Sequence, residues 1–200
     1  MLELITLELG DLRSNCYILH NGVNCVIIDP GATAYKIFDV LNDASLIPEA
    51  VIITHGHFDH IGAVDQICSE YNIPLVIHAD DTSFLNEPSY NLSSSFFESE
   101  LTLKTSNIIT VTENTLEFLG AVFEFIHTPG HSPGSVCILV DDKLFTGDTL
   151  FYMSVGNQFP PFGNLDLEIQ SIKQKLLTLH KDYDCYPGHG PKTSLFFEKE

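Results

Sequence analysis

The sequence predicts an α+β fold, a sandwich of two mixed β-sheets packed face to face with helices on both outer faces. Short apolar or alternating segments typical of strands occur in two groups, separated by a polar stretch at residues 86–107. Segments with helical spacing accompany both groups, so each sheet has helices available to cover it. The 200 residues, 44% hydrophobic and 18% charged, fit a single domain spanning residues 1–200 with an ample core.

The first half of the chain alternates predicted strands and helices. The expected elements are strands at 2–7, 16–20, 25–29, 50–53 and 74–77, and helices at 33–42 and 61–71. Apolar and polar side chains alternate in the first strand, and Asn21-Gly22 favours a tight hairpin turn between the second and third. Ile37 and Leu41 recur at the spacing of one helical face. The last two strands are short apolar runs on either side of a helix, which predicts a βαβ unit.

The second half is predicted to be an antiparallel meander followed by a helix and a last strand. The expected elements are strands at 108–111, 116–119, 122–127, 136–140, 143–145 and 183–186, and a helix at 167–179. The meander strands are short and rich in β-branched or aromatic residues, with turns at Gly120 and Asp141-Asp142. Ile169, Ile172 and Leu176 give the helix an apolar face.

Charge and composition exclude several classes of protein. Twenty-seven acidic residues against nine basic ones give a net charge of −18, which disfavours nucleic acids and anionic membranes as partners. The chain has no run of 18 apolar residues and no basic, apolar leader, so neither a transmembrane helix nor a signal peptide is expected. Five cysteines without a C-x-x-C pair favour a reducing cytoplasm. We therefore expect a small-molecule substrate, and the sequence leaves the oligomeric state open.

A compact set of metal-binding side chains follows the predicted strand at 50–53. The potential ligands are His55, His57, Asp59 and His60. Alternate residues such as His55 and His57 can face the same way, whereas the adjacent Asp59 and His60 must diverge. One loop between a strand and a helix can therefore serve two metal ions.

Three further potential ligands stand at predicted strand ends beside glycine or proline. They are His131 in T-P-G-H-S-P-G, Asp148 in T-G-D-T and His189 in P-G-H-G. Strand ends flanked by glycine give a ligand a rigid support and allow close approach of the backbone. Five histidines and two aspartates at four strand ends together predict a metal centre.

With these motifs, the chain resembles metallo-β-lactamase-fold hydrolases, and among them a glyoxalase II-like short form without the C-terminal helical domain. The matching motifs are H-x-H-x-D-H at 55–60, H-T-P-G-H-S at 127–132, G-D-T at 147–149 and P-G-H-G at 187–190. The resemblance implies one metal on His55, His57 and His131. It implies a second metal on Asp59, His60 and His189, with Asp148 bridging the two. These ligands suit two divalent ions, Zn²⁺ first, with Fe or Mn as alternatives.

The resemblance implies a binuclear metal-dependent hydrolase of small activated acyl compounds, foremost a thioesterase like hydroxyacylglutathione hydrolase. A metal-bridging hydroxide would attack the carbonyl, and the metals would stabilise the oxyanion. Asp148 would balance the charge between the cations, and either Asp59 or a metal-bound water would protonate the leaving group. Asp29, Thr54 and His127 are candidates for orienting the ligand imidazoles, with capping or turn roles as the alternative.

The chain departs from glyoxalase II in two features. The family has a helical segment after the last ligand and a basic residue in a G-K or G-R step, both of which contact glutathione. Here the sequence ends at Glu200 and the step is Gly156-Asn157, followed by the apolar segment 158–162. Glutathione specificity is therefore not implied, and the apolar segment is a candidate pocket wall for an uncharged acyl group.

Two alternative activities remain open. Persulfide dioxygenases share the fold and the H-x-H-x-D-H motif but are mononuclear iron oxidoreductases that use two His and one Asp. Their usual G-R-x-D step is missing here. A lactonase uses the same acyl chemistry as a thioesterase. A nuclease is opposed by the net charge of −18, and flavodiiron proteins carry Glu where this chain has His57.

The polar stretch at 86–107 contains several large side chains in otherwise hydrophilic surroundings. Loops of this length in a compact domain are often functional covers, and a solvated linker is the alternative. We predict that Tyr90, Phe96 and Phe97 pack over the metal cleft or the adjoining core.

Overall fold

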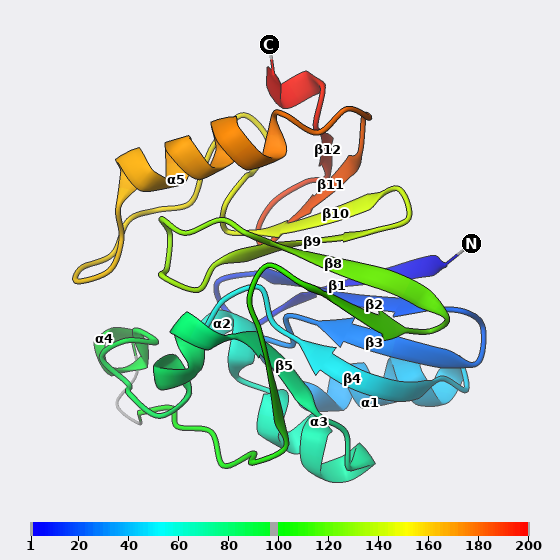
Figure 1. Cartoon of the computed structure of the whole chain (residues 1–200). Helices are drawn as coiled ribbons and strands as arrows, with labels where there is room; N and C mark the ends of the chain where they lie inside the picture. Colours follow the sequence, from blue (N-terminus) through cyan, green and yellow to red (C-terminus); the bar gives the residue numbers. More distant parts are fainter. Residues whose placement is uncertain (1, 97–99, 200) are drawn as a thin grey trace.

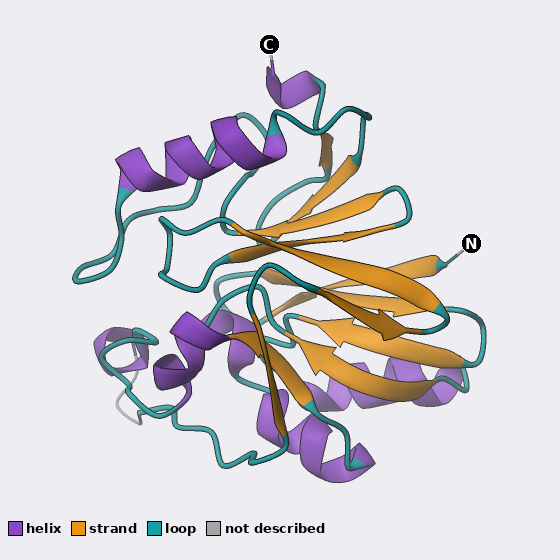
Figure 2. Ribbon diagram, viewed as in Figure 1, coloured by secondary structure: helices purple, strands orange, loops and turns teal. Residues whose placement is uncertain are grey.

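The computed structural model describes residues 2–96 and 100–199 and confirms the predicted sandwich (Figure 1). Two six-stranded sheets have the orders β1-β2-β3-β4-β5-β6 and β12-β11-β10-β9-β8-β7. Figure 2 shows the sheets stacked on each other, with α1 and α3 below one and α5 above the other. Within the described residues, no helix combines the length and apolar character needed to span a membrane.

The first sheet is mixed, with an antiparallel part at its N-terminal strands and a parallel part built from βαβ connections. Its strands are β1 (Glu3–Leu9), β2 (Ser14–His20), β3 (Asn24–Ile28), β4 (Ile47–Ile52), β5 (Leu75–His78) and β6 (Ile108–Val111). Strands β1 to β3 pair antiparallel, and β3 to β6 pair parallel. The accompanying helices are α1 (Ala34–Asp43), α2 (Phe58–Ile61), α3 (Val64–Tyr71), the 3₁₀ helix η1 (Ala79–Leu85) and α4 (Ser93–Phe96).

The second sheet is antiparallel except for the parallel pair β10 and β11. Its strands are β7 (Thr115–Phe118), β8 (Ala121–His127), β9 (Val136–Val140), β10 (Lys143–Gly147), β11 (Asp184–Pro187) and β12 (Thr193–Ser194). The helices are α5 (Leu165–Ser171), its π-helical continuation η2 (Ile172–Leu176) and the short 3₁₀ helix η3 (Phe197–Lys199).

Two sequence-based predictions about these elements are wrong. Strand β6 was expected in the meander, but it pairs parallel with β5, with Ile109 opposite Val76, and so completes the first sheet. The single helix expected at 61–71 is two helices, α2 and α3. Gly62 lies at the break, where a side chain would meet the carbonyl oxygen of Gly31 at 2.3 Å, so the backbones approach too closely for any larger residue.

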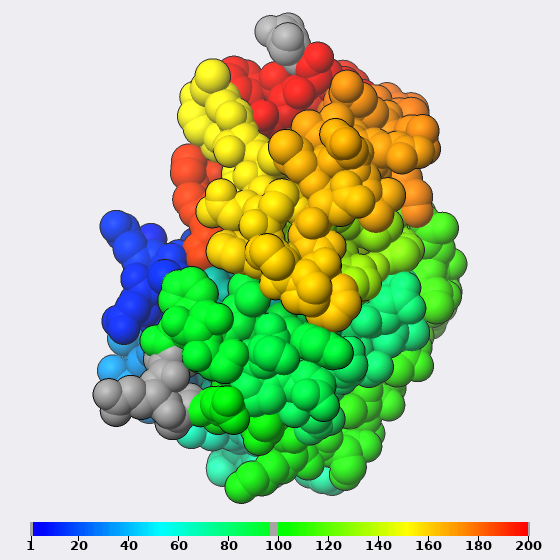
Figure 3. Space-filling model, turned by 90° about the vertical axis from the view of Figure 1, so that its left-hand side faces the viewer, coloured from blue at the N-terminus to red at the C-terminus, as the bar shows by residue number. Residues whose placement is uncertain are grey.

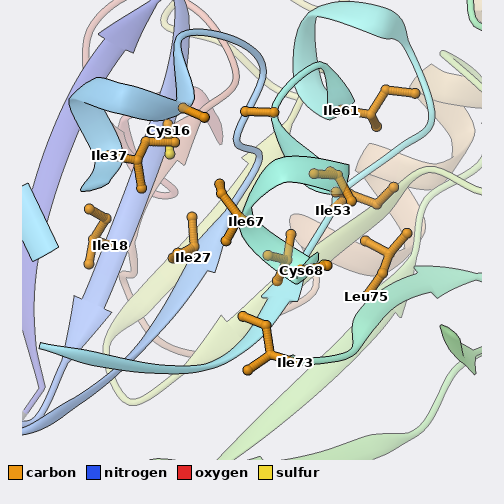
Figure 4. Packing of buried hydrophobic residues seen from close by; sticks show 14 of the residues in the cluster. Cys16, Ile18, Ile27, Ile37, Ile53, Ile61, Ile67, Cys68, Ile73 and Leu75 are labelled. Carbon is orange, nitrogen blue, oxygen red and sulfur yellow. The ribbon is translucent and has the colours of Figure 1, made fainter. Parts of the chain in front are cut away.

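The hydrophobic core lies both between the sheets and beneath the helices. Strand β2 is buried on both faces because Ile18 packs under the helices while Tyr17 and Leu19 pack between the sheets. Figure 4 shows the layer under the helices, where Ile37 and Ile67 meet the first sheet. All five cysteines are free and buried, as expected of small core residues.

Candidate metal centre

Three imidazoles converge at the end of β4 and the end of β8. His57 Nδ1 lies 2.9 Å from His131 Nε2, which lies 3.2 Å from His55 Nε2. All three side chains are buried. Burial lowers the pKa of His55 and His131 and lowers that of His57 to about 3, so the rings are neutral. Nitrogens on a tetrahedral zinc ion, at about 2.0 Å each, lie about 3.3 Å apart. Three neutral ring nitrogens at this spacing are suited to one shared cation.

A second group forms beside the first, from α2 and the loop after β11. His189 Nε2 lies 3.1 Å from Asp59 Oδ2, and His60 Nε2 lies 3.5 Å from the same oxygen. Ser14 Oγ also donates to Asp59 Oδ2 at 2.9 Å. The side chains of Asp59 and His189 are 13% and 25% exposed, whereas His60 is fully buried, so the group is open to solvent on one side.

Asp148, directly after β10, connects the two groups. Its Oδ1 lies 3.4 Å from His60 Nε2, and its Oδ2 lies 3.6 Å from both His131 Nε2 and His189 Nε2. His60 Nε2 and Asp148 Oδ1 are buried and have no hydrogen-bond partner. Buried polar atoms are otherwise almost always paired, so these two atoms fit a bound cation. The structure thus brings all seven predicted residues together, in the two groups that the resemblance implied.

The carboxylates set the charge of this centre. Burial alone would raise the pKa of Asp59 and Asp148 and lower that of His60. The mutual attraction between these groups outweighs burial, so the two aspartate pKa values are lowered and the pKa of His60 is raised. Burial would lower the pKa of His189, but the neighbouring carboxylates of Asp59 and Asp148 outweigh it and raise this pKa. A concentration of ionised carboxylate next to imidazole is an environment that favours a cation.

Hydrogen bonds on the far ring nitrogens orient the imidazoles. His60 Nδ1 donates to Asp29 Oδ2 at 3.1 Å, which directs His60 Nε2 at Asp59 and Asp148. Asp29 also accepts from Thr54 N and Thr54 Oγ1, each at 2.7 Å, and Thr54 Oγ1 lies 3.2 Å from His55 Nδ1. Asp29 and Thr54 therefore make the contacts expected of residues that orient ligands.

Backbone carbonyls hold two more imidazoles in the same way. His131 Nδ1 donates to Asn157 O at 2.9 Å, and His189 Nδ1 donates to Leu12 O at 3.1 Å. Both bonds leave Nε2 facing the centre. The orienting role considered for His127 is not supported, because its Nε2 donates to Pro133 O at 2.8 Å and its ring stacks on His78 at 4.0 Å.

Asp81 is a residue that sequence reasoning missed. Its side chain is fully buried and accepts from Gly56 N at 2.9 Å, Ser132 Oγ at 2.7 Å and Gly134 N at 2.6 Å. Burial raises its pKa to about 6. Asp81 thereby ties the loop of His55 and His57 to the loop of His131, and no local pattern distinguishes it from its exposed neighbour Asp80.

Aromatic side chains close the centre on the side of His57 and His131. The ring centroid of Phe159 lies 6.0 Å from that of His57 and 6.4 Å from that of His131, so this residue of the apolar segment 158–162 lies beside the centre. The ring centroid of Phe162 lies 5.3 Å from that of Phe84 and 4.8 Å from that of Tyr90. Figure 3 shows this contact as the yellow segment resting on the green one.

The predicted packing of the stretch 86–107 holds for the two aromatic residues that the structure describes. Tyr90 joins the aromatic wall, and Phe96 packs on Phe58 at 5.0 Å while remaining 50% exposed. Phe97 lies outside the described residues. The stretch therefore contributes to the surroundings of the centre, as expected of a cover.

Comparison with known proteins agrees with this geometry. The sequence profile of the Metallo-beta-lactamase superfamily matches residues 9–189. "Probable metallo-hydrolase YqgX" of Bacillus subtilis is 34% identical over 196 residues, which cover 97% of this chain and 93% of the relative. "Hydroxyacylglutathione hydrolase GloC" of Haemophilus influenzae is 30% identical over 191 residues, which cover 94% of this chain and 90% of the relative.

Solved structures show the same relationship. The crystal structure of the B3 metallo-beta-lactamase BLEG-1 superposes with a TM-score of 0.92 at 34% identity, covering 98% of this chain and 96% of that one. The structure of TTHA1623 in a di-iron-bound form superposes with a TM-score of 0.86 at 31% identity, covering 98% and 97%. With a matching profile over nearly the whole chain, relatives above 30% identity and the same sandwich around clustered His and Asp side chains, the chain belongs to the metallo-beta-lactamase superfamily.

Proposed function

We propose that this chain is a binuclear metal-dependent hydrolase of small activated acyl compounds, foremost thioesters. The observation that carries the proposal is the position of Asp148, whose two oxygens face His60 at 3.4 Å and His131 at 3.6 Å. One carboxylate between two ligand groups is what a pair of metal ions needs. The names of the metallo-hydrolase and hydroxyacylglutathione hydrolase relatives support this reaction class.

The proposed ligands form two sets joined by one residue. His55, His57 and His131 would hold one ion, Asp59, His60 and His189 the other, and Asp148 both. Imidazole and carboxylate suit Zn²⁺, Fe and Mn, and no thiolate is present to restrict the choice. Zinc is our first expectation, and the di-iron form of TTHA1623 supports iron as the alternative.

When bound, two such ions would make a shared water acidic near neutral pH and polarise the acyl carbonyl as Lewis acids. The protein's own contribution is to keep the ligands in the required state. Burial keeps His55 and His57 neutral, so their lone pairs are free to bind. Asp59 and Asp148 stay ionised and offset the positive charge. The leaving group would take its proton either from Asp59, whose side chain is 13% exposed, or from a metal-bound water.

The test combines metal analysis with a substrate panel. Protein purified without added metal should contain about two ions per chain after extensive dialysis, as two ligand sets require. The loaded protein should hydrolyse neutral acyl thioesters, and lactones included in the panel distinguish a lactonase. A firm content of one iron together with oxygen consumption on a persulfide would instead establish the dioxygenase activity.

A further inference from the structure

A large cavity opens beside Asp59, on the side of the centre away from the aromatic wall. Its volume is about 1080 Å³, and it lies between the β1–β2 turn, the start of α1, helix α3 and the residues Phe96, Glu100 and Leu101. Ligand pockets usually measure about 300–1,000 Å³, so this cavity has room for more than a short acyl group. Its apolar lining includes Leu9, Leu12, Phe38, Phe58, Phe96 and Leu101.

The cavity borders the centre. Asp59 and Ser14 line the cavity, and they are also hydrogen-bonded to each other within the second ligand group. Leu12 lines the cavity and accepts, through its carbonyl oxygen, the hydrogen bond that orients His189. In Figure 3 the β1–β2 turn, in blue, lies next to the orange-red chain around residue 190.

Exposure indicates the side from which a substrate reaches the centre. The side chains of Asp59 and Asp148 are 13% and 11% exposed, and that of His189 is 25% exposed. Next to the aromatic wall, the side chain of His131 is 1% exposed, and His57 is buried as well. Of these residues Asp59 also lines the cavity, so the cavity meets the centre at its more exposed ligand group.

The charges around the cavity are of one sign. Asp11, Glu70 and Glu100 line it together with Asp59. Among the described residues of the lining, none is a lysine, arginine or histidine. The nearby Arg13 is paired with Glu8 at 2.7 Å. Carboxylates without a matching base repel an anionic group and attract an ammonium group.

We propose that this cavity holds the tail of the substrate, and that the tail is an extended alkyl chain without negative charge, an ammonium end being preferred to a carboxylate. The inference rests on the proposed function and specifies its substrate class. The apolar walls take the chain, and the carboxylates of Glu70 and Glu100 discriminate between the ends. Acyl thioesters with a long neutral or cationic tail are the substrates that this cavity fits.

The kinetic test uses thioesters of one neutral thiol that differ only in the tail. The acyl groups are acetyl, heptanoyl, 6-aminohexanoyl and adipoyl. We expect kcat/KM to be at least about tenfold higher for 6-aminohexanoyl than for adipoyl, the scale of one charge-assisted contact. Heptanoyl should exceed acetyl because only the longer chain fills the cavity.

Two variants locate these preferences. The double change Glu70→Gln and Glu100→Gln should reduce the ratio of 6-aminohexanoyl to adipoyl turnover. The matched control, Glu117→Gln with Glu124→Gln on β7 and β8, removes the same charge from exposed positions away from the cavity and should leave the ratio unchanged. Ser69→Trp, at an exposed α3 position in the lining, should reduce the ratio of heptanoyl to acetyl turnover.

A binding measurement separates this inference from the proposed function. Hexylamine should shift the amide NMR signals of Gly62, Gln66 and Ser69, and hexanoate at the same concentration should not. If acetyl and all other thioesters are left intact by metal-loaded protein, the proposed function is wrong, while selective hexylamine shifts would still support the cavity as a site for such tails. If acetyl thioester is hydrolysed but tail length and charge change neither turnover nor binding, the inference is overturned and the function stands.

Discussion

The contact between Asp29 and His60 allows a ring orientation to be tested without disturbing the fold. Asp29 Oδ1 accepts from Thr54 N, and Oδ2 accepts from Thr54 Oγ1 and from His60 Nδ1. Asp29 has a φ of 51°, a left-handed conformation that asparagine adopts as readily as aspartate. Asp29→Asn therefore preserves the backbone and the size of the side chain.

The substitution should move the proton of the neutral His60 ring from Nδ1 to Nε2. The amide oxygen must face Thr54 N, which cannot turn away, so the amide nitrogen takes the place of Oδ2 and donates to His60 Nδ1. The neutral ring then carries its proton on Nε2, the atom that faces Asp59 and Asp148. Loss of an orienting partner typically costs about 10- to 100-fold in metal affinity. The free energy of unfolding should fall by only about 1 kcal/mol, because the two hydrogen bonds accepted by Oδ2 are replaced by two that the amide nitrogen donates, to His60 Nδ1 and to Thr54 Oγ1.

Competition with a chelator measures the affinity of each metal ion. Imidazole ¹⁵N shifts of metal-free protein, recorded at a pH high enough for the ring to be neutral, report which nitrogen of His60 is protonated. We expect the affinity of one ion to fall and that of the ion on His55, His57 and His131 to change much less. Asp39→Asn is the matched control, because Asp39 is an exposed carboxylate on α1. Unchanged affinity for both ions in Asp29→Asn would refute the orienting role of Asp29.

Three further predictions concern other parts of the site. Asp148→Ala should lower metal content below about two ions per chain as well as turnover, since the ions lose their shared anion; full occupancy by elemental analysis would exclude the bridge. Lactoylglutathione should be a poor substrate beside a neutral lactoyl thioester, and Asn157→Arg should raise kcat/KM for the glutathione conjugate alone by about tenfold to a hundredfold; a wild-type preference for the conjugate would contradict this. Burial raises the pKa of Glu168 from 4.5 to about 8, so its stabilising contribution is present below pH 4.5 and lost as the pH rises through about 8. Glu168→Gln should therefore melt higher than the wild type by more than about 5 °C near pH 9 and by little near pH 5, with chelator present; a constant difference would show that the carboxyl does not titrate in this range.

The sequence by itself predicted the sandwich, which the structure confirms, and the seven candidate ligands, which the structure brings together. Both follow from local signals, since strand and helix periodicity depend on neighbouring residues and ligands stand at strand ends beside glycine or proline. The expected divergence of the adjacent Asp59 and His60 is wrong, because both side chains lie in the second group, with His60 Nε2 3.5 Å from Asp59 Oδ2. The structure brought His131 and His189 to these groups from loops far along the chain.

Tertiary structure alone decided the features that depend on distant parts of the chain. Strand β6 pairs with β5, from which it is separated by a long connection. Its β-branched residues predict a strand but do not indicate which neighbouring strand it pairs with. The need for glycine at position 62 comes from the carbonyl of Gly31, which lies beside it only in the folded chain. Asp81 accepts hydrogen bonds from both ligand loops, whereas Asp80 is exposed. The folded backbone decides which of the two side chains points inward. The cavity beside Asp59 is likewise formed by four segments that meet only after folding, so its shape and charge had no local sequence signal.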